Sequence, residues 1–481
     1  MKVNTFKNLT ILLILCLSML ASSSVIAQNN NFNNSINRYS LDLYHQTKAE
    51  SENLFLSPLS TYYLLLMAYE GSENKTKQEF ENVLHLNSSD SLKNSCQHNI
   101  ACKIATNPNF NVYNAIWIDK SLPIKAEYSE RVINKYSSEI KQTDFSNIQS
   151  AISEINSWVS DKTNQRITEI VDVNSINSNV KVLLSNAVYF KGEWLNKFEK
   201  QQTKLELFYS SSENQYKIDF MKKTEKLQYF ENEELQLISK PYKDSSLSFC
   251  IILPKKLFGI GEIEEKLNSE MFDKIINNTN NTLTSLSIPK FSLEFDYQLL
   301  EALNNLGLKS AFNNEADFSG ITQTPLMFGG VIHKTWFELD EEKTEAAAAT
   351  STIMIKGLPP SYKVFKADHP FVFCIIDNNT KTILFMGRFI EPVAGVKIVE
   401  DMDNLKTNLE KRIEEKTTIN YKPDNLLWVV DKKIVTQDEL NAINPANIES
   451  INIIKDKEEI NNYSTVQYDG IIEITLKKET N

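Results

Sequence analysis

The sequence has 481 residues, of which 41% are hydrophobic and 23% are charged, and this composition is typical of folded domains with a sizeable core. The length suits one large domain with a small second one, or two to three domains. The formal net charge of −11 argues against binding to nucleic acid, so no nucleic-acid partner is expected.

Residues 1–27 are typical of a secretory signal peptide. Lys2 and Lys7 precede an apolar run over residues 11–20, and residues 25–27 suit cleavage after a small residue. A transmembrane anchor is the alternative, but the apolar run is shorter than a bilayer requires. We therefore expect a mature chain without a transmembrane segment that is secreted, periplasmic or held at the cell surface.

Four of the five cysteines remain after removal of the signal peptide, too few for a disulfide framework in a chain of this length. Cys250 and Cys374 lie in apolar strand-like runs, which predicts buried free thiols. Cys96 and Cys102 could form a disulfide only if their segment is not one regular helix, because six residues of helix rise about 9 Å.

Helical patterns dominate the first third of the chain. Apolar residues recur at helical spacing over residues 36–44, and a Ser-Pro break at residues 57–58 opens a second helix that continues through Tyr69. Residues 155–171 also have helical periodicity. The continuous apolar run that follows, over residues 180–190, predicts a strand.

Strand patterns dominate from there to Pro392. Short apolar runs bounded by proline predict strands over residues 227–254 and 285–295. Two further runs, within residues 369–390, lie on either side of Asn378-Asn379, a turn signal that predicts a hairpin. Because helices and strands are partly segregated along the chain, the predicted fold class is α+β.

The C-terminal part divides into a linker and a small module. Residues 393–423 are dense in charge, which is typical of a solvated helix or linker. Residues 424–481 predict a small α+β module, with three strand-like runs that begin at Leu426, Ile448 and Gly470 and a helix candidate, TQDELNAI.

Motifs for a metal site, a phosphate-binding loop or an enzyme nucleophile are absent from the sequence. The five histidines have no helical metal-site spacing, and no GxSxG, GxxxxGK or GxGxxG pattern occurs. We therefore expect no enzymatic activity, no cofactor and no metal. His333 and His369 lie beside strand-like runs, which favours structural hydrogen-bonding roles.

Residues 341–360, EEKTEAAAATSTIMIKGLPP, carry two conflicting patterns. Four consecutive alanines favour a helix, and a short surface helix is one interpretation. In a strand, the alternate residues from Thr344 to Thr352 would form one small, weakly polar face that could enter an existing sheet without a clash. An exposed loop that can become a central strand stores a conformational change.

Motifs on both sides of this segment carry a resemblance to a known family. They occur in order and include NLFLSPLSTYYLLLMAYEGSENKT at 53–76, SNAVYFKGEWLNKF at 185–198, VIHKTWFELDEEKTEAAAAT at 331–350 and ADHPFVFCIIDNNTKTILFMGRFIEP at 367–392. Residues 28–392 resemble a serpin, the serine-protease-inhibitor fold. The resemblance implies three β-sheets, eight or nine helices, a monomer and an exposed reactive-centre loop.

The resemblance also implies a mechanism. A protease cleaves the loop and forms an acyl-enzyme, and the freed loop then inserts into the main sheet and traps the distorted enzyme. By the same resemblance the hinge of the loop consists of Glu341, Glu342, Lys343, Thr344, Glu345, Ala346, Ala347, Ala348, Ala349 and Thr350.

One hinge residue departs from the family pattern. Inhibitory serpins usually have glycine where this sequence has Lys343. A strand would place Lys343 and Glu345 on the solvent face, so the lysine need not block insertion, but the backbone freedom of glycine is lost. The alternative function is therefore a non-inhibitory serpin-fold binding or carrier protein whose hinge is impaired by Lys343.

Two bonds compete as the reactive bond. By the resemblance, Glu341 aligns with the hinge acid that is the seventeenth residue back from the cleaved bond in the family, and this count leads to Gly357-Leu358. Side-chain chemistry instead favours Lys356-Gly357, because a lysine fits the acidic pocket of a trypsin-like protease. Cleavage after Leu358 is disfavoured by Pro359. We predict Lys356-Gly357, with a trypsin-like serine protease as the partner and papain-like cysteine proteases as a further target class.

The C-terminal module resembles the plug domain of TonB-dependent outer-membrane receptors, in VVD, INPANIESI, IKD and GIIEIT. Lys432-Lys433 stands in place of the glycine turn usual in that family. The resemblance implies a Gram-negative envelope and two possible roles for residues 424–481: docking to an envelope partner, or a passive folded tail.

Overall fold

The computed structural model of this chain describes residues 33–49, 52–86, 110–341, 362–393, 396–398, 426–435, 448–454 and 470–476, except 137, 174, 177–179, 191 and 244. The predicted signal peptide, Cys96, Cys102 and residues 342–361 lie outside these ranges. Within them, no helix is long and apolar enough to cross a membrane.

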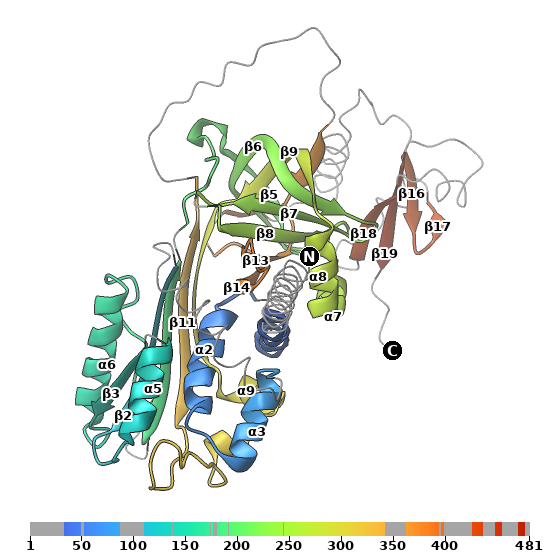
Figure 1. Ribbon diagram of the computed structural model, residues 1–481. Helices are drawn as coiled ribbons and strands as arrows, with labels where there is room; N and C mark the ends of the chain where they lie inside the picture. The colour runs from blue at the N-terminus through green and yellow to red at the C-terminus, as the bar shows by residue number, and fades with distance from the viewer. Residues whose placement is uncertain are drawn as a thin grey trace, which may run out of the picture.

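A ten-stranded sheet forms one half of the main domain (Figure 1). Eight of its strands follow the order β1-β14-β13-β8-β7-β6-β9-β12, while β5 and β15 pair only with β6. The strands are β1 (Leu54–Leu56), β5 (Lys204–Tyr209), β6 (Gln215–Glu231), β7 (Leu235–Pro241), β8 (Leu247–Pro254), β9 (Asn280–Pro289), β12 (Lys363–Lys366), β13 (Phe371–Asp377), β14 (Ile383–Phe389) and β15 (Val396–Ile398).

Strand β6 links the two parts of this sheet. Its residues 220–229 pair with β9, and residues 228–231 pair with β7. The long strand thereby belongs to both halves of the ten-stranded sheet. The predicted hairpin at Asn378-Asn379 is confirmed as β13 and β14, which pair antiparallel.

A second sheet has five strands in the order β10-β11-β4-β2-β3. They are β2 (Phe110–Asp119), β3 (Glu139–Thr143), β4 (Val182–Phe190), β10 (Phe291–Gln298) and β11 (Gly330–Leu339). Strands β4 and β11 are parallel neighbours at its centre. Core residues cover both faces of this sheet, Leu184 and Val188 on one and Leu183 and Ala187 on the other.

Eight α-helices occur in the described part of the chain, in agreement with the α+β fold expected. One spans residues 33–47. The others are α2 (Pro58–Tyr69), α3 (Asn74–Val83), α5 (Ala126–Tyr136), α6 (Ile148–Lys162), α7 (Ile260–Lys266), α8 (Ser269–Asn277) and α9 (Leu300–Leu306). Short 3-10 turns occur at Lys200–Gln202 and Ser310–Phe312. Helix α2 begins at the predicted proline and is buried along its whole length.

The helix predicted over residues 155–171 ends earlier than expected. Helix α6 stops at Lys162, and Asn164 and Gln165 adopt left-handed backbone angles with φ of 51° and 60°. A helix cannot continue through two such residues. The Thr163 hydroxyl accepts a hydrogen bond from the Ile167 amide at 3.0 Å, so the chain turns back along α6.

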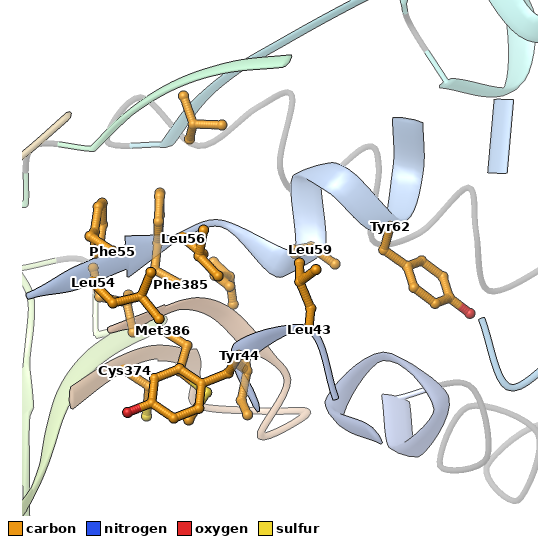
Figure 2. Packing of buried hydrophobic residues seen from close by; sticks show 14 of the residues in the cluster. Leu43, Tyr44, Leu54, Phe55, Leu56, Leu59, Tyr62, Cys374, Phe385 and Met386 are labelled. Atoms are coloured by element: carbon orange, nitrogen blue, oxygen red, sulfur yellow. The ribbon is translucent and has the colours of Figure 1, made fainter. Parts of the chain in front are cut away.

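The main core is rich in stacked aromatic rings. Phe55 of β1 lies 5.1 Å from Phe385 and 4.8 Å from Phe337, measured between ring centroids, and thereby links the two sheets. Figure 2 shows Phe55 beside Phe385, with Met386 and Cys374 nearby. Cys374 lies opposite Cys250 on the neighbouring strand, and both thiols are free and buried, as predicted.

A separate four-stranded sheet lies in the C-terminal module, in the order β17-β16-β19-β18. Its strands are β16 (Leu426–Val430), β17 (Lys433–Ile434), β18 (Ile448–Ile454) and β19 (Gly470–Leu476). The three strand-like runs predicted here are therefore strands, and the helix candidate TQDELNAI lies outside the described residues. Strand β15 lies within the segment predicted as a linker and pairs with the start of β6.

Candidate functional site

The junction between β4 and β11, which we call the joint, is the main candidate site. The two strands pair in parallel over eight residue pairs, from Leu183 with Gly330 to Phe190 with Phe337. Residues 340–362 connect the end of β11 to β12 in the sequence. A segment that turned back after β11 would run antiparallel to both β11 and β4, and it could therefore hydrogen-bond to both of them.

Within the described residues the joint is closed, because β11 pairs directly with β4 and no strand lies between them. The backbone groups with which β4 and β11 face each other are already paired across the joint. Entry of a new strand must therefore separate β4 from β11 along this whole length.

Glu341 anchors the chain where it leaves β11. Its carboxylate is 5% exposed, lies 2.8 Å from the Lys290 ammonium and accepts a hydrogen bond from the Thr203 hydroxyl at 2.8 Å. Burial alone would raise the pKa of Glu341, but hydrogen bonds from Lys290 and Thr203 lower it below its ordinary value. The group is therefore ionised at neutral pH and holds the first hinge residue in place.

An aromatic platform supports the same end of the joint. The Trp194 indole donates a hydrogen bond to the Asp340 carbonyl at 2.9 Å and stacks on Tyr242 with 4.8 Å between ring centroids. The Lys240 ammonium lies 5.3 Å from the Trp194 ring and 4.7 Å from the Phe198 ring. Cation–π contacts of this kind compensate in part for removing the ammonium from water.

Lys240 is a buried cation with a carboxylate partner. It contacts Glu225 and donates a hydrogen bond to the Asn196 carbonyl at 2.8 Å. Burial lowers the pKa of Lys240 to about 8, although Glu225 acts in the opposite direction. The pair is thus a charged element in the core next to the Trp194 ring, which holds the end of β11.

His333 of β11 and Asn186 of β4 close the middle of the joint. They are register partners, and the His333 Nδ1 atom lies 2.5 Å from the Asn186 Oδ1 atom. The Ser57 amide donates to His333 Nε2 at 3.0 Å, so Nδ1 carries the proton and donates it to Asn186. The Ser60 hydroxyl also donates to Asn186, at 2.8 Å. Burial lowers the pKa of His333 to about 3, and the ring is neutral.

Comparisons with known proteins identify the family. The family model described as serpin (serine protease inhibitor) matches residues 34–392. The chain belongs to the serpin family. An uncharacterized serpin-like protein of Thermococcus kodakarensis is 35% identical over 372 residues, which cover 75% of this chain and 86% of that protein. Leukocyte elastase inhibitor of Xenopus laevis is 32% identical, covering 75% of this chain and 100% of its own length.

The same fold occurs in solved serpin structures. Tengpin, a thermophilic serpin solved in its native state, matches with a TM-score of 0.68 and 31% identity, covering 75% of this chain and 94% of its own. The serpin fold expected from the sequence is thus confirmed, and membership of the family supports protease inhibition in general.

Of the predicted site residues, the structure of this serpin describes one. Glu341 lies at the end of β11 with the partners given above. The rest of the hinge, residues 342–350, and both alternatives for the reactive bond, Lys356-Gly357 and Gly357-Leu358, lie outside the described residues.

The sequence did not reveal the partners of Glu341 or the role of His333 at the joint. Lys290 is 51 residues from Glu341 and follows a strand of the other sheet, so no local pattern connects them. His333 was predicted to be a structural hydrogen-bonded histidine, and this is confirmed. Its position opposite Asn186 depends on strand register, which a single sequence does not specify.

Proposed function

We propose that this serpin inhibits a trypsin-like serine protease, with Lys356-Gly357 as the reactive bond and the joint as the site of loop insertion. The observation that supports it most is the closed parallel pairing of β4 and β11 directly before the predicted loop. One further antiparallel strand could enter once β4 and β11 separate, and the segment that would supply it follows β11 in the sequence.

In the proposed reaction the protease serine attacks the Lys356 carbonyl carbon, the bond from that carbon to the Gly357 nitrogen breaks, and the nitrogen leaves with a proton. The Lys356 carbonyl is then an ester on the enzyme. Insertion of the residues before Lys356 carries the acylated enzyme along the sheet before water can release it.

The energy for this step comes from added strand pairing. Because the joint spans eight residue pairs, one further strand gains about eight net hydrogen bonds, or about 8 kcal/mol at about 1 kcal/mol each. Burial of the small face from Thr344 to Thr352 adds to this value. The total is large enough to hold an enzyme in a distorted state.

The site of action is proposed from the sequence alone. Residues 1–27 support export, and the resemblance of residues 424–481 to a plug domain supports a Gram-negative envelope. The module would then dock this serpin to an envelope partner while its main domain inhibits the protease.

A gel experiment with trypsin tests the proposal. The expected result is an SDS-resistant complex of serpin and trypsin, together with a released fragment whose N-terminus is Gly357. Lys356→Ala should lose the complex with trypsin, whereas Lys356→Arg should keep it. A fragment that begins at Leu358 would move the reactive bond to the alternative position, and papain in place of trypsin tests the second target class.

The carrier hypothesis predicts a different outcome in the same experiment. Trypsin would cleave the loop and leave as free active enzyme, and the melting temperature of the cleaved serpin would not rise. That pair of results would exclude inhibition by insertion.

A further inference from the structure

A second closure of the joint lies on the face that helix α6 covers. Trp336 of β11 and Tyr189 of β4 are register partners, and their rings stack with 5.3 Å between centroids and 29° between planes. Trp336 packs on the core cluster that includes Trp158 of α6. The stack therefore spans the joint on the face opposite the main core cluster, which contains Leu184 and Val188.

Arg166 covers this stack. Its guanidinium carbon lies 5.8 Å from the Tyr189 ring centroid and 5.5 Å from the Trp336 ring centroid. Among the described residues, no carboxylate forms an ion pair with Arg166. Its contacts to these two rings are cation–π contacts, which the planar guanidinium makes well.

The backbone that presents Arg166 is fixed. The Gln165 amide donates to the Ser160 carbonyl at 2.7 Å, and the Arg166 amide donates to the Thr163 carbonyl at 3.1 Å. Further along, the Asn156 carboxamide oxygen accepts hydrogen bonds from the Ile170 and Val171 amides at 2.9 and 3.1 Å.

The segment is also held by burial. Ile167, Ile170 and Val171 are at most 2% exposed and belong to the cluster under α6. Asn164 and Gln165 remain in left-handed conformations, which cost free energy and persist only where surrounding contacts hold them. Arg166 is thus presented from a fixed turn.

Insertion is incompatible with these contacts. Neighbouring strands lie about 4.8 Å apart, so one inserted strand places β4 and β11 about 9.6 Å apart. The Tyr189 and Trp336 rings then cannot stay stacked, and one guanidinium cannot cover both.

The structure assigns to Arg166 the role of a positioning residue that holds the joint closed and sets the rate at which a strand enters it. The assignment deepens the proposed function, on which it rests, by naming a residue that regulates insertion. In this role Arg166 acts through Tyr189 and Trp336, the register partners that it covers.

Uptake of a synthetic peptide tests this role without a protease. Full-length serpin is incubated with a fluorescein-labelled peptide of residues 342–355, and fluorescence anisotropy gives the rate of uptake. Arg166→Ala should take up the peptide about fivefold faster than wild type, the size expected when two partly exposed cation–π contacts are lost. Arg166→Lys, which keeps the charge, should fall between the two.

Two control variants separate the joint from general effects. Lys162→Ala removes a cation from the last residue of α6, whose ammonium lies 6.0 Å from the Tyr113 ring on β2, away from the joint. Its uptake rate should equal that of wild type. Ile276→Val trims the core under α8 and measures the effect of lost stability alone. The role of Arg166 is refuted if Arg166→Ala matches wild type, or is no faster than Ile276→Val.

Trapping of trypsin and uptake of the peptide are separate measurements, so the role of Arg166 and the proposed function can fail independently. If no variant traps trypsin but Arg166→Ala still takes up peptide faster than both controls, inhibition is excluded and the role of Arg166 at the joint stands.

Discussion

The neutral His333 ring makes the stability of this serpin depend on pH in a defined window. In the folded state burial lowers the pKa of His333 to about 3, whereas an unfolded histidine titrates near 6.5. Below pH 6.5 the unfolded chain therefore binds a proton that the folded chain does not. Stability from this group is complete above pH 6.5 and is lost as the pH falls toward about 3.

The size of the effect follows from the two pKa values. Each pH unit between them corresponds to about 1.4 kcal/mol, so the free energy of unfolding should fall by about 2 kcal/mol between pH 7 and pH 5. Carboxylates whose pKa is lowered by partners, such as Glu341, titrate mainly below this window. The contributions of all other groups must be subtracted.

Urea unfolding of wild type and His333→Gln at pH 7 and pH 5 provides that subtraction. Glutamine keeps an acceptor for the Ser57 amide and cannot take up a proton in this range. The pH-dependent loss should be about 2 kcal/mol larger in wild type than in His333→Gln. Equal losses in the two proteins would show that His333 is not held neutral in the joint.

Three further changes test the other elements of the site. Glu341→Gln should lower the free energy of unfolding by about 1 kcal/mol. This loss is smaller than that of a fully buried charged hydrogen bond, because the Lys290 side chain is 42% exposed. The control is Glu315→Gln, in an ion pair whose two side chains are each 64% exposed, and it should cause no measurable change in urea unfolding. Lys240→Met should destabilise by about 3 kcal/mol in the same assay, because it leaves Glu225 buried without its cation; an unchanged midpoint would contradict this. Lys343→Gly should increase the fraction of trypsin trapped per serpin cleaved, measured by titration of residual activity, and no increase would show that the lysine does not impair the hinge.

The elements of this fold could be predicted where local chemistry decides them. The proline at position 58 marks the start of α2, and Asn378-Asn379 marks the β13–β14 turn, because both signals act within a few residues. The early end of α6 was missed, since apolar spacing continues past Lys162 in residues that pack under the helix without being part of it. Periodicity records which residues are buried, not which backbone angles they have.

The candidate site could be predicted only in part, for a similar reason. The two-faced pattern after Glu341 indicates a segment that can become a strand, but it does not say where that strand would go. The place depends on β4 and β11 being neighbours, although 139 residues separate the end of one from the start of the other. That pairing brings His333 to Asn186 and Trp336 to Tyr189.

The contacts that close the joint differ in exposure and charge, and we expect these differences to set the order in which the contacts break. The Glu341–Lys290 pair is partly exposed to water through Lys290, and the His333 network is neutral and buried. In the third contact the rings of Tyr189 and Trp336 are half-buried, and the Arg166 side chain that covers them is exposed. A strand that enters from the Glu341 end first meets the contact that water can replace most easily. Only then does it separate the buried pair, whose polar atoms the backbone of the new strand can satisfy in turn. In the proposed insertion, opening in this order would never leave the whole set of buried polar groups without partners at once, so a joint that is stable at rest could still admit a strand.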